Sequence, residues 1–226
     1  IYVGHNNCNI SNTDFSGFSG LKSLDISKLN LTEIPASLGS LQKLSSLNVS
    51  NNAIVSFSNL SSLNQLQELN LANNNLNKVP SEIINFISLK SLDLSNNIIT
   101  DFSSLSNLIN LEWLSLENNS LQNIPNQVSN LQKLIHLNLG RNKINGSTSI
   151  LGTLNHLQQI WLNHNKLSGN IPQDLLALPN LMCLSLQSNE LEGTIPNNIP
   201  QICNISNNRF SKTQIENYLN TNSNNT

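Results

Sequence analysis

The chain has 226 residues, of which only 11% are charged, and its formal net charge is −2. Its 11 Lys and Arg residues form no basic stripe, which argues against the electrostatic footprint of a nucleic-acid-binding protein. Apolar runs are only a few residues long, so no membrane span is expected, and no signal peptide is recognisable.

One apolar pattern repeats along most of the chain. Each cycle reads L-x-x-L-x-L-x-x-N-x-L with minor substitutions, and we number its places one to eleven. The cycles begin at Leu21, Leu44, Leu66, Leu89, Leu111, Leu134, Leu157 and Leu181. A period of this length held over eight cycles is the signature of a solenoid. The pattern therefore predicts stacked coils whose strands, near places three to five, lie side by side.

The first residues match the same pattern in part. Ile1, Val3, Asn6 and Cys8 fit places four, six, nine and eleven, and Leu21 then opens the next cycle in phase. We expect Ile1 to lie within a strand, with an open edge of the stack beside it. Because the end repeats of solenoids need caps, the sequence predicts further repeats or a cap upstream of Ile1.

The places of the pattern divide into structural ones and free ones. Leu and Ile at places one, four, six and eleven are expected to form the core. Asn fills place nine in every full cycle except the first, which has Leu29, and we expect it to bond buried backbone groups. Places two, three, five, seven and eight face outward in this scheme, so they are where function is sought.

These repeats resemble the leucine-rich repeat family over about residues 1–210. The segments Leu167–Pro172 and Leu191–Pro196 are similar to the L-x-G-x-I-P variant of plant-type repeats, found in receptor ectodomains and polygalacturonase-inhibiting proteins. Other cycles, with Ile34-Pro35 or with Phe57, equally resemble intracellular Ras-suppressor-like and phosphatase-regulator-like proteins. The resemblance implies an α/β solenoid: a right-handed superhelix with a parallel β-sheet on the concave face and a mostly irregular or 3-10 convex side.

The C-terminal end is expected to close the stack. A shortened last cycle begins its apolar places at Cys203, and the spacing of Ser211 and Gln214 fits a capping box. We therefore divide the chain into a repeat domain, 1–210, and a segment, 211–226, with a cap helix over the last coil and a disordered tail. The apolar residues expected on one face of this helix are Ile215, Tyr218 and Leu219.

Cysteines and N-x-S/T triplets bear on the location of the protein. Cys183 at place three and Cys203 at place four should point to opposite sides, so we expect three free thiols, Cys8 included. The eight triplets match the number that the Asn, Ser and Thr content gives by chance, so they do not indicate glycosylation. The plant-type motif and the low charge favour an extracellular or cell-surface location, with the cytoplasm as the alternative.

The candidate recognition site is the outward face of three consecutive cycles. Both Trp residues of the chain lie there, Trp113 at place three and Trp161 at place five. Exposed Trp is enriched at binding hot spots, although the indoles can also simply shield the sheet. The polar and charged residues expected to share this surface are His136, Asn138, Glu117, Arg141 and His164.

Catalysis finds little support in the sequence. His164 and Cys183 fall about 16 Å apart along the strand direction, too far for a nucleophile and its base. No metal-ligand spacing or phosphate loop is recognisable, so neither metal nor cofactor is expected.

The sequence instead predicts a non-catalytic module that binds a protein ligand through its concave face, as part of a larger receptor or adhesion protein. The alternatives are an inhibitor or regulator of an enzyme, an intracellular signalling scaffold, and a structural or filament component. Carbohydrate binding through the two Trp residues is a further, weaker alternative.

Overall fold

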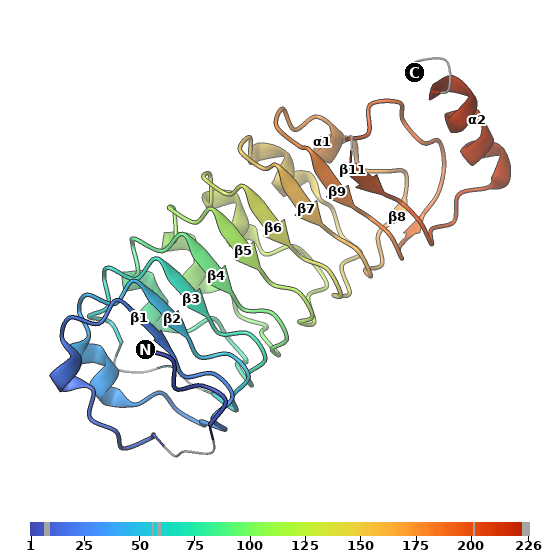
Figure 1. The fold of residues 1–226 in the computed structure, drawn as a ribbon. Coiled ribbons are helices and arrows are strands. Elements are labelled where there is room, and N and C mark those ends of the chain that lie inside the picture. Colours follow the sequence, from blue (N-terminus) through green and yellow to red (C-terminus); the bar gives the residue numbers. More distant parts are fainter. Residues whose placement is uncertain (7–9, 56, 58–59, 201, 223–226) are drawn as a thin grey trace.

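The computed structural model describes residues 1–6, 10–55, 57, 60–200 and 202–222. These residues form one elongated stack of coils, with the two chain ends at opposite ends of the stack (Figure 1). Short strands lie side by side along one face, and turns return the chain behind them. This is the leucine-rich repeat architecture that the period predicts.

Within the described residues, the main sheet contains nine parallel strands that follow one another in chain order. Each strand covers places three to five of its cycle, as predicted, and neighbours pair place by place; Trp113, for example, pairs with His136. The strands are β1 (Ser23–Asp25), β2 (Ser46–Asn48), β3 (Glu68–Asn70), β4 (Ser91–Asp93), β5 (Trp113–Ser115), β6 (His136–Asn138), β7 (Gln159–Trp161), β9 (Cys183–Ser185) and β11 (Ile202–Asn204). We call the outward side of this sheet, where the side chains of places three and five lie, the sheet face.

The return segments behind the sheet are mostly short 3-10 helices. Pro35, Pro80 and Pro125 stand directly before three of them, each with φ between −53° and −59°, as the proline ring requires. The return elements are η1 (Ser16–Phe18), η2 (Ala36–Ser40), η3 (Ser81–Asn85), η4 (Ser103–Asn107), η5 (Asn126–Asn130), η6 (Ser149–Thr153) and the short helix α1 (Gln173–Leu176). The convex side is therefore 3-10 and irregular, as expected.

The two plant-type cycles differ from the rest by a small second sheet. It pairs β8 (Ser168–Gly169) with β10 (Glu190–Leu191). Gly169 and Gly193, the glycines of the two L-x-G-x-I-P motifs, have φ of 75° and 83°. Glycine adopts this left-handed region without steric penalty, which explains its place in the motif.

The core is a continuous strip of Leu and Ile closed by a ladder of Asn side chains. Asn97 shows the pattern: its Nδ2 donates to the carbonyls of Leu71 at 3.0 Å and Leu94 at 3.1 Å, and its Oδ1 accepts the N–H of Leu76 at 3.0 Å. Each place-nine Asn thus joins its own coil to the preceding one. The structural role predicted for this column is confirmed.

The first residues pair with β1 in the predicted register. Tyr2 bridges to Asp25, the N–H of Asp25 donates to the carbonyl of Ile1 at 2.9 Å, and that of Val3 donates back to Asp25. Ile1 is therefore the place-four residue of a coil, as its spacing indicates. Cys8, the predicted place-eleven residue, lies outside the described residues.

The C-terminal helix α2 (Lys212–Asn222) forms with the predicted capping box. The N–H of Ser211 donates to Oε1 of Gln214 at 2.6 Å, and the N–H of Gln214 donates to the Ser211 hydroxyl at 3.2 Å. The expected packing of its apolar face is wrong in part. Tyr218 is half-buried against the core, but Ile215 and Leu219 remain 43% and 57% exposed.

Two further expectations concern thiols and the membrane. Cys183 and Cys203 are both free, as predicted. Across the described residues, no helix has the length and apolar character needed to cross a bilayer.

Candidate recognition surface

Two rows of side chains cross the sheet face in strict register. In the row of place three, Trp113 lies beside His136, and in the row of place five, Asn138 lies beside Trp161. Neighbouring strands are about 4.8 Å apart, so the two Trp backbones are separated by about 10 Å along the stack and by two residues across it. One extended segment of a partner is long enough to contact both indoles.

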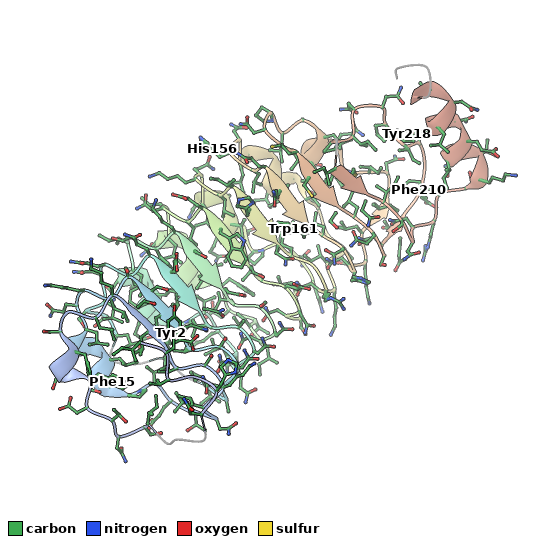
Figure 2. The ribbon with its side chains drawn as sticks, viewed as in Figure 1. Tyr2, Phe15, His156, Trp161, Phe210 and Tyr218 are labelled. Carbon is green, nitrogen blue, oxygen red and sulfur yellow. The ribbon has the colours of Figure 1, made fainter. Side chains whose placement is uncertain are left out.

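Both indoles lie outside the apolar core, as predicted. Trp113 and Trp161 are each partly exposed, and neither belongs to the buried cluster of Leu and Ile. Trp161 is seen over the sheet in Figure 2. His136 between them is also partly exposed, so the three rings share one accessible surface.

Place five is not a free position, contrary to our interpretation of the sequence. Its Asn and Asp side chains accept the N–H two residues later, which closes the turn at the end of each strand. Asn138 does so with Gly140 at 3.0 Å, and the other residues that make this bond are Asp25, Asn48, Asn70, Asp93 and Asn204. Asn138 is therefore first a structural residue.

Trp161 also occupies place five, but its side chain cannot accept the N–H two residues later. An indole has one N–H donor and no acceptor, so it cannot accept the N–H of residue 163. Ser115 keeps a weak version of the contact, with the Glu117 N–H at 3.4 Å from its hydroxyl. At Trp161 the chain carries a side chain that does not serve the turn, which favours a role outside the fold.

The charged residues of the predicted site form one small network. Oε2 of Glu117 accepts a hydrogen bond from Nδ2 of Asn138 at 3.0 Å, and Oε1 of Glu117 lies 3.2 Å from Nε of Arg141. The Arg141 side chain is 59% exposed, so this ion pair is screened by solvent and contributes at most about 1 kcal/mol. The network links the cycle of Trp113, which contains Glu117, to the cycle of His136, which contains Asn138 and Arg141.

Arg141 and His164 share an unusual backbone conformation. Both occupy place eight, which has φ between 49° and 58° in every full cycle. Asn tolerates this left-handed region best among residues with a Cβ, and it fills place eight at Asn51, Asn73, Asn96, Asn118 and Asn207. Lys28, Arg141, His164 and Ser188 replace it, and of these His164 lies in the cycle of Trp161 and Arg141 in the cycle before it. Bulky residues in such a conformation often mark functional positions.

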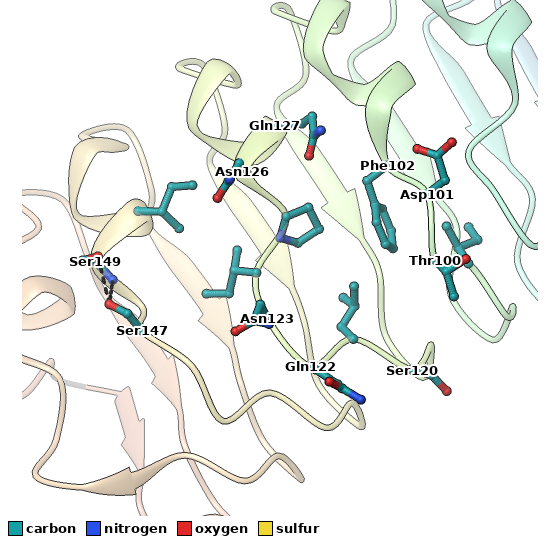
Figure 3. Close-up of a pocket in the computed structure, with 15 residues that line it drawn as sticks. Thr100, Asp101, Phe102, Ser120, Gln122, Asn123, Asn126, Gln127, Ser147 and Ser149 are labelled. Carbon is teal, nitrogen blue, oxygen red and sulfur yellow. Dashed lines mark hydrogen bonds between the residues drawn. The ribbon is translucent and has the colours of Figure 1, made fainter.

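A large hollow among the described residues lies away from the sheet face. It has a volume of about 890 Å³ and is lined by the return segments of three cycles, from Ile99 to Ile150. Polar Gln122, Asn123 and Asn126 and the ring of Phe102 surround it in Figure 3. The sequence alone does not indicate this hollow, because its walls come from residues more than 20 positions apart.

The acids and thiols of the described residues bear on metal binding and nucleophilic catalysis, which require particular arrangements of such groups. In the part of the chain that the structure describes, no three His, Cys, Asp or Glu side chains gather as metal ligands would. Asp101 is the acidic residue that lines the large hollow, and its Oδ1 accepts a hydrogen bond from the N–H of Ser103 at 2.9 Å. Burial raises the pKa of the Cys203 thiol to about 11, which removes the thiolate that a nucleophile requires.

Comparison with known families agrees with this geometry. Two leucine-rich repeat family models match residues 19–76 and 64–121, and 156–178 and 180–202, which together cover more than half of the chain. The chain belongs to the leucine-rich repeat family. Members typically serve as protein-binding modules. No curated protein matches the chain at a significant level.

Several solved leucine-rich repeat structures are similar to this chain. An internalin, inlF, from Listeria monocytogenes is 30% identical with a TM-score of 0.71, over 97% of this chain and 58% of its own. The ectodomain of the receptor kinase GASSHO1/SCHENGEN3 from Arabidopsis thaliana, in complex with Casparian strip integrity factor 2, is 32% identical with a TM-score of 0.67, over 86% and 25%. The plant peptide hormone receptor RGFR1, in complex with RGF2, is 31% identical with a TM-score of 0.69, over 90% and 35%. The chain thus spans little more than half of the internalin and less of the receptors.

Proposed function

We propose that this leucine-rich repeat chain binds a protein or peptide ligand through its sheet face, as the recognition module of a receptor or adhesion protein. The surface is centred on Trp113, His136 and Trp161, with Glu117, Arg141 and His164 along its rim. The observation that carries the proposal is Trp161. It is a partly exposed indole in a column where six other described coils use Asn or Asp to close the turn and two use Ser.

Neighbouring exceptions support the same surface. Arg141 and His164 replace the Asn that suits place eight, His164 in the cycle of Trp161 itself and Arg141 in the cycle before it. Sequences that fold well satisfy local preferences, and departures from them concentrate where function requires other side chains. The receptor structures similar to this chain are in complex with ligands, which is consistent with such a role.

The test uses the residues that this chain itself places at the equivalent positions. Random peptides displayed on phage are selected on the wild-type protein, and their affinities are measured on a variant with Trp113→Ser and Trp161→Asn. Ser occupies the neighbouring position in β4, and Asn at place five makes the turn bond, so the fold is retained. We expect at least a tenfold loss of affinity, since Trp at the centre of an interface contributes about 2 kcal/mol or more.

A matched control removes two exposed apolar side chains elsewhere. Ile84→Ser in η3 and Ile98→Ser after the Asn of place nine leave the sheet face unchanged. Peptides selected on the wild type should bind this control with unaltered affinity. Equal binding to the Trp double variant and the wild type would remove the basis of the proposal.

We also propose that the chain functions outside the cell. The two L-x-G-x-I-P motifs and the likeness to receptor ectodomains support this location. Of the N-x-S/T triplets, Asn145 is exposed and accessible to a glycan, whereas Asn48 is tied to Asp25 and to the N–H of Ser50. Native protein from its own host should lose mass on treatment with a glycosidase, and an unchanged intact mass would contradict the proposal.

A further inference from the structure

A second, smaller hollow lies on the sheet face, on the N-terminal side of Trp113. Its volume is about 410 Å³, and it is lined by residues of β2, β3, β4 and β5. Along the row of place three, Ser46, Glu68, Ser91 and Trp113 follow in register. Because Ser91 has a short side chain, it leaves a slot about 10 Å wide, at backbone level, between Glu68 and Trp113.

Two carboxylates of this slot lack a counterion. Oε2 of Glu68 accepts the Ser46 hydroxyl at 3.0 Å, and Oδ1 of Asp93 accepts the Ser95 N–H at 2.9 Å. Among the described residues, neither acid forms an ion pair, and their second oxygens have no partner. Acids elsewhere that do have a Lys or Arg partner are Glu112, Glu117, Glu190 and Glu216.

The slot therefore combines an aromatic wall with uncompensated negative charge. A guanidinium group suits both, since its plane stacks on an indole and its N–H donors fork toward carboxylates. The volume is at the lower end of small-molecule sites, which fits one long side chain. Arg141 carries the positive charge of the proposed recognition surface, and it belongs to the cycle on the C-terminal side of Trp113, away from the slot.

We propose that this slot receives an arginine side chain from an extended segment of the partner. The proposal rests on the function proposed above, and it fixes one feature of the ligand. The basic residue lies over β3 and β4, with its guanidinium between the Trp113 indole and the carboxylates of Glu68 and Asp93. The segment then continues across His136 toward Trp161.

The experiment follows the two indole N–H signals of the full wild-type chain by NMR. Trp161→Asn leaves Trp113 as the sole tryptophan and so assigns the signals. N-acetyl-arginine amide is the probe, and the citrulline amide, which has the same shape without the charge, is its control at constant ionic strength. We expect the Trp113 signal to shift saturably with a Kd on the order of 10 mM, while the Trp161 signal stays in place.

Isosteric variants test the carboxylates without disturbing the fold. Glu68→Gln with Asp93→Asn keeps both hydrogen bonds, and Asn at place five closes the turn in β2 and β3. This variant should bind the arginine amide at least tenfold more weakly. The matched control, Glu33→Gln with Glu192→Gln, has the same net charge, lies off the sheet face and should bind like the wild type.

Two outcomes would overturn the assignment: equal shifts with arginine and citrulline amides, or undiminished binding by the Glu68→Gln, Asp93→Asn variant. Failure here is separable from failure of the proposed function. Peptides that still depend on Trp113 and Trp161 would then show a recognition surface without an arginine slot. Arginine binding at Trp113 without any such dependence would show the reverse.

Discussion

Asn residues have three different structural roles in this chain, according to their place in the cycle. At place nine the side chain is buried and bonds the backbone of two coils, as Asn97 does. At place five it closes a turn, as Asn138 does. At place eight it adopts a left-handed backbone conformation at low steric cost, as Asn73 does with φ of 54°. The high Asn content of the chain thus has a structural use at these three places.

The buried ladder should be the most sensitive of the three. Asn97→Ala leaves the N–H of Leu76 buried without a partner and removes one of the two donors to the carbonyl of Leu71, so we expect a loss of about 2 kcal/mol or more in the free energy of unfolding. Denaturant titration measures this loss. The exposed Asn155→Ala should change stability by less than about 0.5 kcal/mol. A comparable effect at both positions would contradict the ladder interpretation.

The two described thiols should differ in reactivity. Burial, assisted by the neighbouring Cys183, raises the pKa of Cys203 to about 11, so roughly one molecule in a thousand carries its thiolate at pH 8. Burial also raises the pKa of Cys183, which is less enclosed. Iodoacetamide labelling followed by peptide mass spectrometry should modify Cys183 at least tenfold faster.

The same shift links the stability of the chain to pH. A thiol whose pKa is raised on folding holds its proton in the folded state, while the same thiol in the unfolded chain, with a pKa of 9.0, loses it. The stabilising contribution is therefore complete below pH 9 and is lost as the pH rises toward 11. Equal labelling rates for Cys183 and Cys203 at pH 8 would show that the thiol of Cys203 is not enclosed.

At the level of elements, α2 is held by its cap more than by its packing. The capping box of Ser211 and Gln214 satisfies two N–H groups at its start, while Ile215 and Leu219 stay exposed. Helices without a buried face depend on such local terms, because an isolated helix of this length is marginal in water.

Removing the cap should therefore loosen α2 alone. Ser211→Ala is expected to cost about 1 kcal/mol, seen as faster amide hydrogen exchange within Lys212–Asn222 and an unchanged denaturation midpoint for the sheet. The control Thr213→Ala, at an exposed position inside the helix, should slow exchange, since Ala is the better helix former. A shifted midpoint for the whole chain would mean that α2 stabilises the last coil.

On the scale of the whole molecule, each coil contacts mainly its two neighbours. The strands of the main sheet pair in an unbroken order, and the Asn ladder links each coil to the one before it. Stability in such a stack is close to a sum of repeat terms and nearest-neighbour terms. The destabilising effect of a defect in a central coil should consequently be strongest in the adjacent coils and weaken with distance from it.

Leu114→Ala provides the test, because this residue is completely buried in β5. We expect a loss of about 3 kcal/mol, with faster hydrogen exchange in β4 and β6 and little change in β1. Ile98→Ala, at a side chain that is 61% exposed, is the control and should be nearly neutral. Uniformly faster exchange from β1 to β9 would indicate one fully cooperative unit instead.

Spacing along the sequence is enough to predict the coils, their register and the side of the sheet on which both Trp residues lie. The strands at places three to five, the Asn ladder and the capping box at Ser211 all follow from spacing, because each depends on interactions that recur once per cycle. The tertiary structure decided what spacing does not encode: that Asn138 closes a turn, that Glu117 pairs with Arg141, and that Ile215 and Leu219 stay exposed. It also decided that Ser91 leaves a slot between Glu68 and Trp113. These contacts join side chains of different cycles, or depend on how one element packs on another, and their geometry is fixed only when the coils stack.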